Sequence, residues 1–170
     1  DWSSDVCSSD LVKNANVGNA AIYKSFDFGQ TWTMLNTGFP ATGLIQRTKL
    51  CIAPSNPNCV YALTVDVNNG MQGFYKSVDA GQTWVNMNVG LNLLDYGDGT
   101  GTGGQGTYDL ALCVNQTNEN KVYVGGISIW GSDDGGQRLI QFVIGLLLMD
   151  LVSIPDRKST RLNSSHANIS

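Results

Sequence analysis

The sequence predicts an all-β fold, a fragment of a β-propeller with roughly two to three four-stranded blades. The pattern S-x-D-x-G-Q-T-W occurs at 25–32 and at 77–84, and a third copy opens at Ser132 and then departs from it. The copies begin about 50 residues apart with four short β-rich runs per unit, a period typical of a propeller blade. With 20 glycines and only 14% charged residues, the composition favours short strands and tight turns over helices.

Each copy of the pattern predicts the turn of a hairpin. The aspartate can accept hydrogen bonds from backbone N–H groups inside the turn, and the serine can do so at its entrance. The glycine permits a positive φ, and the tryptophan should anchor the hairpin on the sheet. The residues assigned to this structural role are Ser25, Asp27, Gly29, Thr31, Trp32, Ser77, Asp79, Gly81, Thr83, Trp84, Ser132, Asp134 and Gly136.

The three aspartates should therefore lie in separate hairpins of successive blades and should not form a catalytic set. The blade pieces are expected at about 12–40, 43–90 and 107–138. The expected strands are 20–25 and 31–35 in the first piece, 43–52, 59–65, 71–76 and 83–87 in the second, and 108–114, 121–124 and 126–130 in the third.

The Gly-rich insertion at 93–106 separates the second and third units. Asp95 and Asp98 do not have the spacing of a calcium-binding EF-hand, and the segment lacks the G-K-[ST] of a phosphate loop. Two interpretations stay open, a blade-connecting loop and a ligand-facing loop.

The apolar stretch 139–151 has no strand-like alternation and is too short for a membrane-spanning helix. A buried strand pair or a short helix would explain it. A frameshift after Gln137, which we favour for 139–155, is the alternative, because the codons of Arg138-Leu139-Ile140 read two bases on as Thr-Phe-Asn and restore the repeat.

Both ends of the chain resemble translated sequencing-adapter DNA. Residues 1–11 (DWSSDVCSSDL) back-translate to an oligonucleotide whose reverse complement encodes Asp-Arg-Lys-Ser-Thr-Arg-Leu-Asn-Ser-Ser, the sequence of 156–165. We therefore expect 1–11 and 156–170 to be adapter-derived and exclude them from the fold.

Charge and residue usage exclude several classes of site. The net charge is −4 with no basic stripe, so a nucleic-acid partner is not expected. The single histidine, His166, lies in the adapter-like end, so histidine catalysis, metal sites and cofactors are not expected in 12–155. Cys51 and Cys59 flank a predicted turn and either form a disulfide or are two small buried residues; no C-x-x-C zinc spacing occurs.

The S-x-D-x-G-x-T-W pattern resembles the Asp-box, also called the BNR repeat. The run 53–58 followed by Val60-Tyr61-Ala62 resembles repeats of sortilin-type and related secreted propellers, and 108–130 is similar to extracellular propeller proteins of Bacteroidetes-type bacteria. The resemblance implies an extracellular or cell-surface bacterial protein. It also implies that the box is structural and peripheral to the axis where substrates bind.

Two functions follow from this resemblance, which covers sialidases, xyloglucan-type glycosidases, receptors and non-catalytic surface proteins. The first is a non-catalytic scaffold that binds an unknown protein or glycan, completed by further blades of its own chain. The alternative is a fragment of a propeller glycoside hydrolase, more like a xyloglucanase than a sialidase.

A sialidase needs an arginine cluster, and within 12–155 only Arg47 and Arg138 are available. A xyloglucanase needs two opposed carboxylates. The candidates are Asp66, Asp95, Asp98 and Asp109, each of which a turn also explains, so no catalytic residue is assigned.

One prediction follows from blade number. Propellers close with at least about four blades, so residues 12–155 alone would leave sheet edges and blade faces uncovered. We expect this segment, expressed alone, to aggregate or fold poorly in size-exclusion chromatography and thermal melts. A monomer with a sharp, reversible melt would contradict this expectation.

Overall fold

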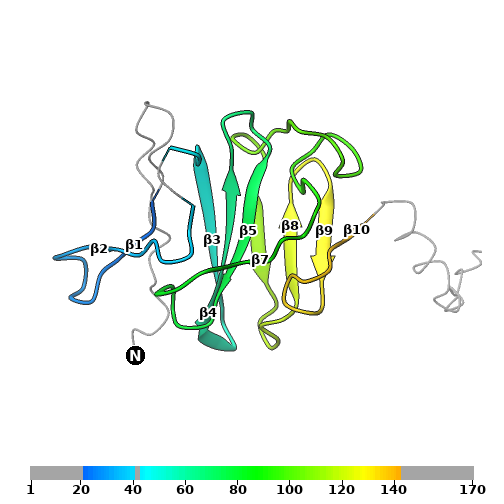
Figure 1. Ribbon diagram of the computed structural model, residues 1–170. Coiled ribbons are helices and arrows are strands. Elements are labelled where there is room, and N and C mark those ends of the chain that lie inside the picture. Colours follow the sequence, from blue (N-terminus) through cyan, green and yellow to red (C-terminus); the bar gives the residue numbers. More distant parts are fainter. Residues whose placement is uncertain (1–20, 41–42, 143–170) are drawn as a thin grey trace, which may run out of the picture.

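The computed structural model describes residues 21–40 and 43–142, and these residues form strands and turns with no helix. The strands make one two-stranded and two four-stranded antiparallel sheets (Figure 1). They are β1 (Tyr23–Lys24), β2 (Thr33–Met34), β3 (Arg47–Ala53), β4 (Asn56–Val65), β5 (Met71–Ser77), β6 (Val85–Asn86), β7 (Ala111–Val114), β8 (Val122–Gly125), β9 (Ile129–Ser132) and β10 (Ile140–Phe142).

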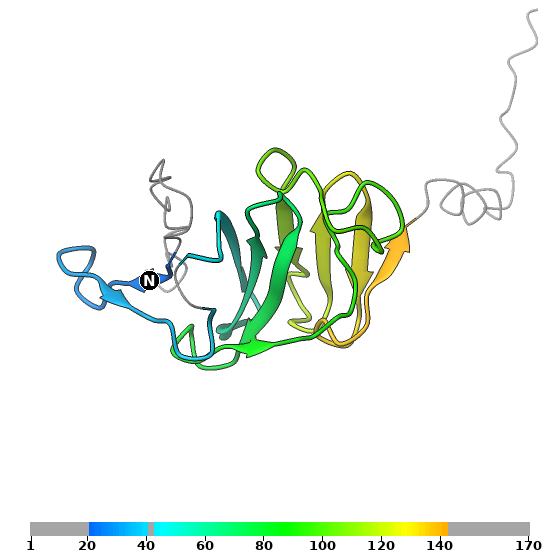
Figure 2. The same ribbon diagram turned by 45° about the horizontal axis from the view of Figure 1, so that its top comes forward.

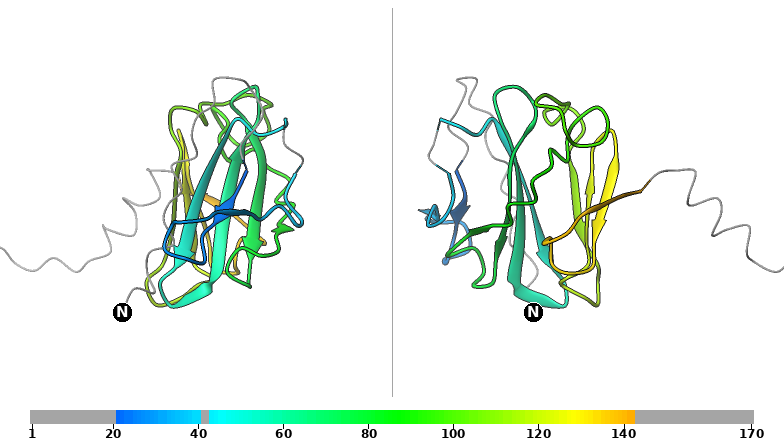
Figure 3. Two further views of the ribbon diagram at one scale, coloured as in Figure 1. Left: turned by 90° about the vertical axis from the view of Figure 1, so that its left-hand side faces the viewer. Right: turned by 45° about the vertical axis from the view of Figure 1, so that its right-hand side comes forward.

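Each four-stranded sheet follows chain order, β3-β4-β5-β6 and β7-β8-β9-β10. We call these sheets the second and third blades and the β1–β2 pair the first hairpin. The two blades stand side by side, with the first hairpin beyond the second blade, on the side away from the third (Figures 2 and 3). Sequential antiparallel strands repeated in this way are the architecture of propeller blades.

The second blade is buried on both faces because a neighbour covers each side. On one face Tyr61, Leu63 and Phe74 pack against Val124 and Trp130 of the third blade, within a larger apolar cluster. The other face forms a second cluster of Val60, Ala62, Tyr75 and Trp84 with Ile22 and Phe39 of the first unit. This two-sided burial explains why the 59–65 run is continuously apolar and not alternating.

Polar contacts join neighbouring units near their Ser–Asp turns. The ammonium group of Lys24 donates to the carbonyl of Ala80 at 2.9 Å, and that of Lys76 donates to Asn120 Oδ1 at 3.0 Å. The buried Tyr61 hydroxyl donates to the carbonyl of Glu119 at 2.8 Å. Each lysine precedes a turn in its own unit and bonds to the next unit, so the repeat also sets the spacing between units.

The Ser–Asp turn of the second blade is closed by its own side chains. Asp79 Oδ1 accepts from the Thr83 N–H at 2.9 Å and from the Ser77 hydroxyl at 2.7 Å, and Asp79 Oδ2 accepts from the Thr83 hydroxyl at 2.6 Å. Ser77 Oγ accepts from the Gly81 N–H at 2.8 Å. Gly81 has a φ of 86°, a conformation that side chains disfavour.

The same pattern of bonds occurs in the other two turns, with one difference. In the first hairpin Asp27 accepts from the Thr31 N–H and hydroxyl, and Ser25 from the Gly29 N–H. In the third blade Ser132 accepts from the Gly136 N–H, and Asp134 accepts the backbone N–H of Arg138 at 2.9 Å. Arg138 has no hydroxyl, so Asp134 lacks the side-chain bond that threonine provides.

Trp32 does not anchor its hairpin as the repeat predicts. It is 48% exposed, whereas Trp84 is 4% exposed between the second blade and Phe39. The described part of the first unit has only the short strands β1 and β2, so it offers no sheet on which Trp32 could be buried.

The possible disulfide between Cys51 and Cys59 is not formed, since both residues, like Cys113, are free thiols. The register places Tyr61, not Cys59, directly opposite Cys51, and both cysteines contribute to the apolar cluster that faces the third blade. The alternative interpretation, two small buried residues, holds for Cys59, whereas Cys51 is half-buried against the same cluster.

The third blade extends beyond 138, because Ile140–Phe142 pairs with β9 as its outer strand. This strand is not a buried pair, since Ile140 and Phe142 are exposed. The frameshift proposed for 139–155 falls mainly on residues outside the described ranges and stays a prediction. The adapter-like ends, 1–11 and 156–170, also lie outside the described residues.

The two tryptophans provide a matched test of the packing. Trp84→Ala removes a ring buried between units and should cost about 3–5 kcal/mol of unfolding free energy, the usual range for a core tryptophan. Trp32→Ala should cost less than about 1 kcal/mol because its ring is half exposed. Denaturant unfolding of this chain, in which the described first unit offers Trp32 only the strands β1 and β2, measures both; equal losses would contradict the asymmetric packing.

The Asp79 carboxylate should make stability depend on acid pH. Hydrogen bonds from the Thr83 hydroxyl and N–H lower the pKa of Asp79 from 3.8 to about 2. Because the folded-state pKa is depressed, the stabilisation is present above about pH 4 and is lost as pH falls toward about 2.

Thr83→Val should raise the pKa of Asp79 toward its ordinary value and so reduce the stability that is lost between about pH 4 and about pH 2, as seen in thermal unfolding at a series of pH values. Gln82→Ala is the control, since the side chain of Gln82 bonds to the backbone carbonyl of Asp79 and not to its carboxylate. An unchanged pH profile in Thr83→Val would contradict the assigned cause.

Candidate functional site

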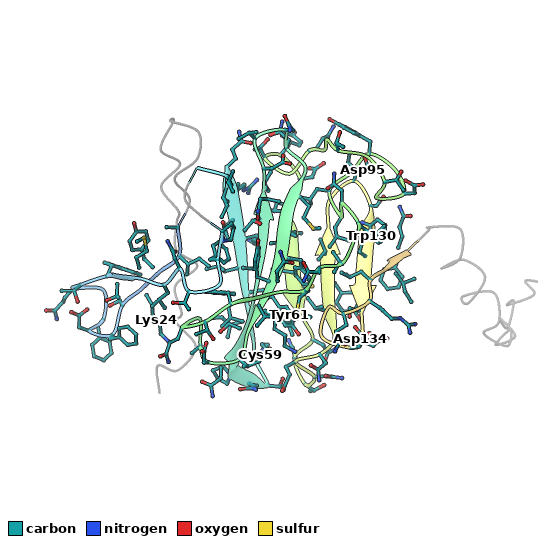
Figure 4. The ribbon with its side chains drawn as sticks, in the orientation of Figure 1. Lys24, Cys59, Tyr61, Asp95, Trp130 and Asp134 are labelled. Atoms are coloured by element: carbon teal, nitrogen blue, oxygen red, sulfur yellow. The ribbon has the colours of Figure 1, made fainter. Side chains whose placement is uncertain are left out.

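The connecting loops gather at the end of the blades opposite the Ser–Asp turns. This loop end consists of the β4–β5 turn (66–70), the connection 91–110 between the blades and the β8–β9 turn (125–128). Figure 4 shows Asp95 at this end, with Cys59 and Asp134 at the other. Loops at one end of a rigid scaffold are where binding residues commonly lie.

Asn92 holds the loop end together through both ends of its amide group. Its Oδ1 accepts from the N–H of Met71 at 2.8 Å and from that of Leu94 at 3.2 Å. Its Nδ2 donates to the carbonyls of Gly101 and Gly103 at 3.0 and 2.9 Å. One side chain thus fixes the start of β5 to both halves of the Gly-rich insertion.

Asp95 organises the insertion from inside. The side chain is 8% exposed, and its oxygens accept from the backbone N–H groups of Tyr96, Gly99 and Gly101 at 2.7, 3.2 and 3.1 Å. These bonds, that from Gly101 foremost, lower the pKa of Asp95 and hold it ionised. A carboxylate so held serves loop structure and is poorly suited to donate a proton.

The insertion is pressed closely onto the second blade. A Cβ at Gly104 would lie 2.8 Å from the carbonyl oxygen of Asn69 in the β4–β5 turn and still closer to that of Leu94, so only glycine fits there. Arg47 Nη1 donates to the carbonyl of Thr107 at 2.7 Å, and the Thr107 hydroxyl donates to Asn69 Oδ1 at 2.9 Å. The insertion is therefore a well-packed loop, and its first two residues, Leu93 and Leu94, are fully buried.

The loop end carries the other candidate carboxylates, but most are already hydrogen-bonded. Asp66 Oδ1 accepts from the N–H groups of Asn68 and Gly70, which closes the β4–β5 turn. Asp98 accepts from the hydroxyl and N–H of Thr100, and these bonds lower its pKa. The carboxylate of Asp109 accepts no hydrogen bond from the residues that the structure describes. Three of these four carboxylates, those of Asp66, Asp95 and Asp98, are thus engaged in hydrogen bonds within their own turns or loops.

The two arginines that might have bound a carboxylate are not brought together. Arg47 begins β3 at the loop end, and Arg138 lies in the Ser–Asp turn at the other end. Among residues 21–40 and 43–142, no group of three or more His, Cys, Asp or Glu side chains is arranged to hold a metal ion. In the same ranges no helix is long and apolar enough to cross a membrane.

Two tyrosines stand out on the loop end. Tyr96 is 61% exposed, yet its hydroxyl donates to the carbonyl of Gly104 at 3.2 Å, which fixes its position. Tyr108, just before β7, is 85% exposed. The loops of this end also carry amide and hydroxyl side chains, among them Asn68, Thr100, Thr102 and Gln105. Exposed aromatic rings among hydrogen-bonding groups are typical of a ligand-binding surface.

The repeat pattern did not identify Asn92, Tyr96 or Tyr108. The residues it singled out, from Ser25 to Gly136, lie in the turns at the opposite end, each aspartate bonded within its own turn. Asn92 carries no motif, and Tyr108 reads as the first residue of a strand. Their common signal is position, since all lie in or beside the one long insertion between repeats.

Solved structures similar to this one include two GH74 enzymes. The GH74 enzyme from Niastella koreensis matches with a TM-score of 0.55 and 20% identity over 76% of this chain and 19% of that chain. The GH74 xyloglucanase from Xanthomonas campestris matches with a TM-score of 0.49 and 17% identity over 72% of this chain and 19% of that one.

No family model and no curated protein matches the sequence. The likeness to the Niastella enzyme, at 20% identity, establishes the fold alone, and the chain spans about a fifth of that enzyme's length. The fold is thus all-β and consists of blades of the β-propeller type.

Proposed function

We propose that the chain is a fragment of a β-propeller protein of the glycoside hydrolase type, and that its loop end is part of a polysaccharide-binding surface. The observation that carries the proposal is the pair of exposed tyrosines, Tyr96 and Tyr108, on a firmly packed loop end. Aromatic rings can stack on the C–H faces of sugar rings, and neighbouring amides and hydroxyls can bond to sugar hydroxyl groups. The similarity in fold to a GH74 enzyme supports the same assignment.

Within this proposal the chain binds and does not catalyse. Asp66, Asp95 and Asp98 are committed to hydrogen bonds within their own loops, so they contribute to the shape of the surface. Asp109 is the loop-end carboxyl group that stays available to a ligand. A hydrolase built on these blades would take at least one of its two carboxylates from elsewhere in the protein.

A non-catalytic scaffold that binds protein or glycan is the second candidate. It is favoured by the same observation, that the carboxylates of Asp66, Asp95 and Asp98 accept hydrogen bonds within their own loops. Both candidates place the protein outside the cell or on its surface, where polysaccharides are met. They differ in whether the complete protein cleaves what it binds.

The tyrosines give the direct test. In the complete protein, Tyr108→Ala should weaken binding to soluble xyloglucan or hydroxyethyl cellulose about tenfold, equivalent to about 1.4 kcal/mol, because a stacking surface is lost. Affinity electrophoresis measures the change. Phe28→Ala is the matched control, since Phe28 is 96% exposed on a Ser–Asp turn at the opposite end and should have no effect.

Reducing-sugar release from the same polysaccharides separates the two candidates. Hydrolysis indicates the enzyme, and binding without hydrolysis indicates the scaffold. If neither polysaccharide binds, or Tyr108→Ala and Phe28→Ala behave alike, the assignment of the loop end is wrong.

A further inference from the structure

The β4–β5 turn contains Asn69-Gly70, the only Asn-Gly dipeptide in the sequence. Glycine leaves its backbone nitrogen unhindered, so an asparagine that precedes glycine readily loses its side-chain amide. The glycine nitrogen, once it has given its proton to a base, bonds to the asparagine Cγ, and Nδ2 leaves as ammonia. Water then opens the resulting succinimide ring to aspartate or isoaspartate. The dipeptide is therefore a place where the chain can modify itself with water as the only reactant.

The folded turn fixes the peptide bond between these two residues. The N–H of Gly70 donates to Asp66 Oδ1 at 3.0 Å, and the carbonyl of Asn69 accepts from the N–H of Gly106 at 2.9 Å. Asn69 has a φ of 64°, the left-handed conformation that closes a tight turn. Asp66 does not start the reaction, because a carboxylate is far too weak a base to remove a proton from a backbone amide. A nitrogen held in this way is not free to bond to Cγ.

The connection between the blades, 91–110, covers the same dipeptide from outside. The Thr107 hydroxyl donates to Asn69 Oδ1 at 2.9 Å, which holds the side-chain amide in one orientation. Gly70 is buried, and a Cβ there would lie 2.7 Å from the carbonyl oxygen of Thr102 and 3.1 Å from Asn92 Nδ2. The Gly70 N–H is thus shielded from bases in solution while the connection is seated, and the reaction requires the connection to lift.

We propose that Asn69 is a deamidation site controlled by the 91–110 connection, which suppresses the reaction while it is seated on the β4–β5 turn and permits it when it lifts. The isoaspartate product makes the change permanent, because its backbone runs through Cβ and Cγ and is one atom longer. A turn so lengthened cannot present the same N–H and carbonyl groups to Asp66 and Gly106. Opening of the connection therefore leads to an irreversible loss of the loop end's shape.

The proposal goes beyond polysaccharide binding and does not depend on it. It rests on the contacts between the β4–β5 turn and the connection, which exist whatever the loop end binds. A protein in which opening controls deamidation but which binds no polysaccharide would overturn the function proposed above and leave this inference intact.

Peptide mass spectrometry of the complete protein at mildly alkaline pH measures the reaction. We expect Asn69 to deamidate at least about tenfold more slowly in the folded protein than in urea, because the reaction waits for local opening. Thr107→Val should speed it about fivefold in the folded protein, the factor expected for one lost hydrogen bond, and Thr107→Ser should not. Thr117→Val is the matched control, since Thr117 also donates to an asparagine Oδ1, that of Asn115 at 3.0 Å, but in the β7–β8 turn.

Cys59, which is 1% exposed, reports global unfolding in the same samples through its alkylation. Deamidation of Asn69 should rise at urea concentrations too low to expose Cys59, because only the connection has to lift. This comparison uses the unaltered protein, so it decides the matter even where Thr107→Val does not fold. Deamidation as fast in the folded protein as in urea, deamidation that rises only in step with Cys59 alkylation, or equal rates in folded Thr107→Val and Thr117→Val would each overturn the proposal.

Discussion

The structure depends on burying the second blade on both faces at once. A lone antiparallel sheet of this size has two apolar faces and cannot shield both from water. Here Tyr61, Leu63 and Phe74 are covered by the third blade, and Tyr75 and Trp84 by the first unit. The lysines and the Tyr61 hydroxyl add hydrogen bonds across the same boundaries, so polar and apolar contacts together fix the blade spacing.

The same constraint separates structure from function along the chain. One end of each blade is closed by a turn whose serine and aspartate bond to each other and to the backbone, joined by a threonine in the first two turns, so Asp27, Asp79 and Asp134 are engaged within the turns. The other end carries a long insertion held by Asn92 and Asp95, and its exposed surface presents Tyr96 and Tyr108. Repeated residues thus build the blades, and the residues outside the repeat form the candidate binding surface.

The exposed apolar side chains at the two sides of the described sheets have one physical origin. Trp32 at one side is 48% exposed where Trp84 of the second blade is 4% exposed, and Phe142 at the other side is 42% exposed. Among residues 21–40 and 43–142, each lies on a unit with a neighbour on one side only. Exposure at these positions reflects an unpaired blade face, whereas exposure of Tyr96 and Tyr108 occurs on a loop end that is itself well packed.

The sequence by itself determined the all-β class, the four-strand unit and the position of each turn. A turn with Asp79 and Gly81 is a local structure, and its bonds join residues at most four apart, so pattern alone suffices. Only the tertiary structure decided the rest. The strand register left Cys51 and Cys59 unbonded, and blade stacking decided which tryptophan is buried. The packing of the insertion turned Asp95 inward and Tyr108 outward, because these outcomes depend on contacts between residues far apart in the chain.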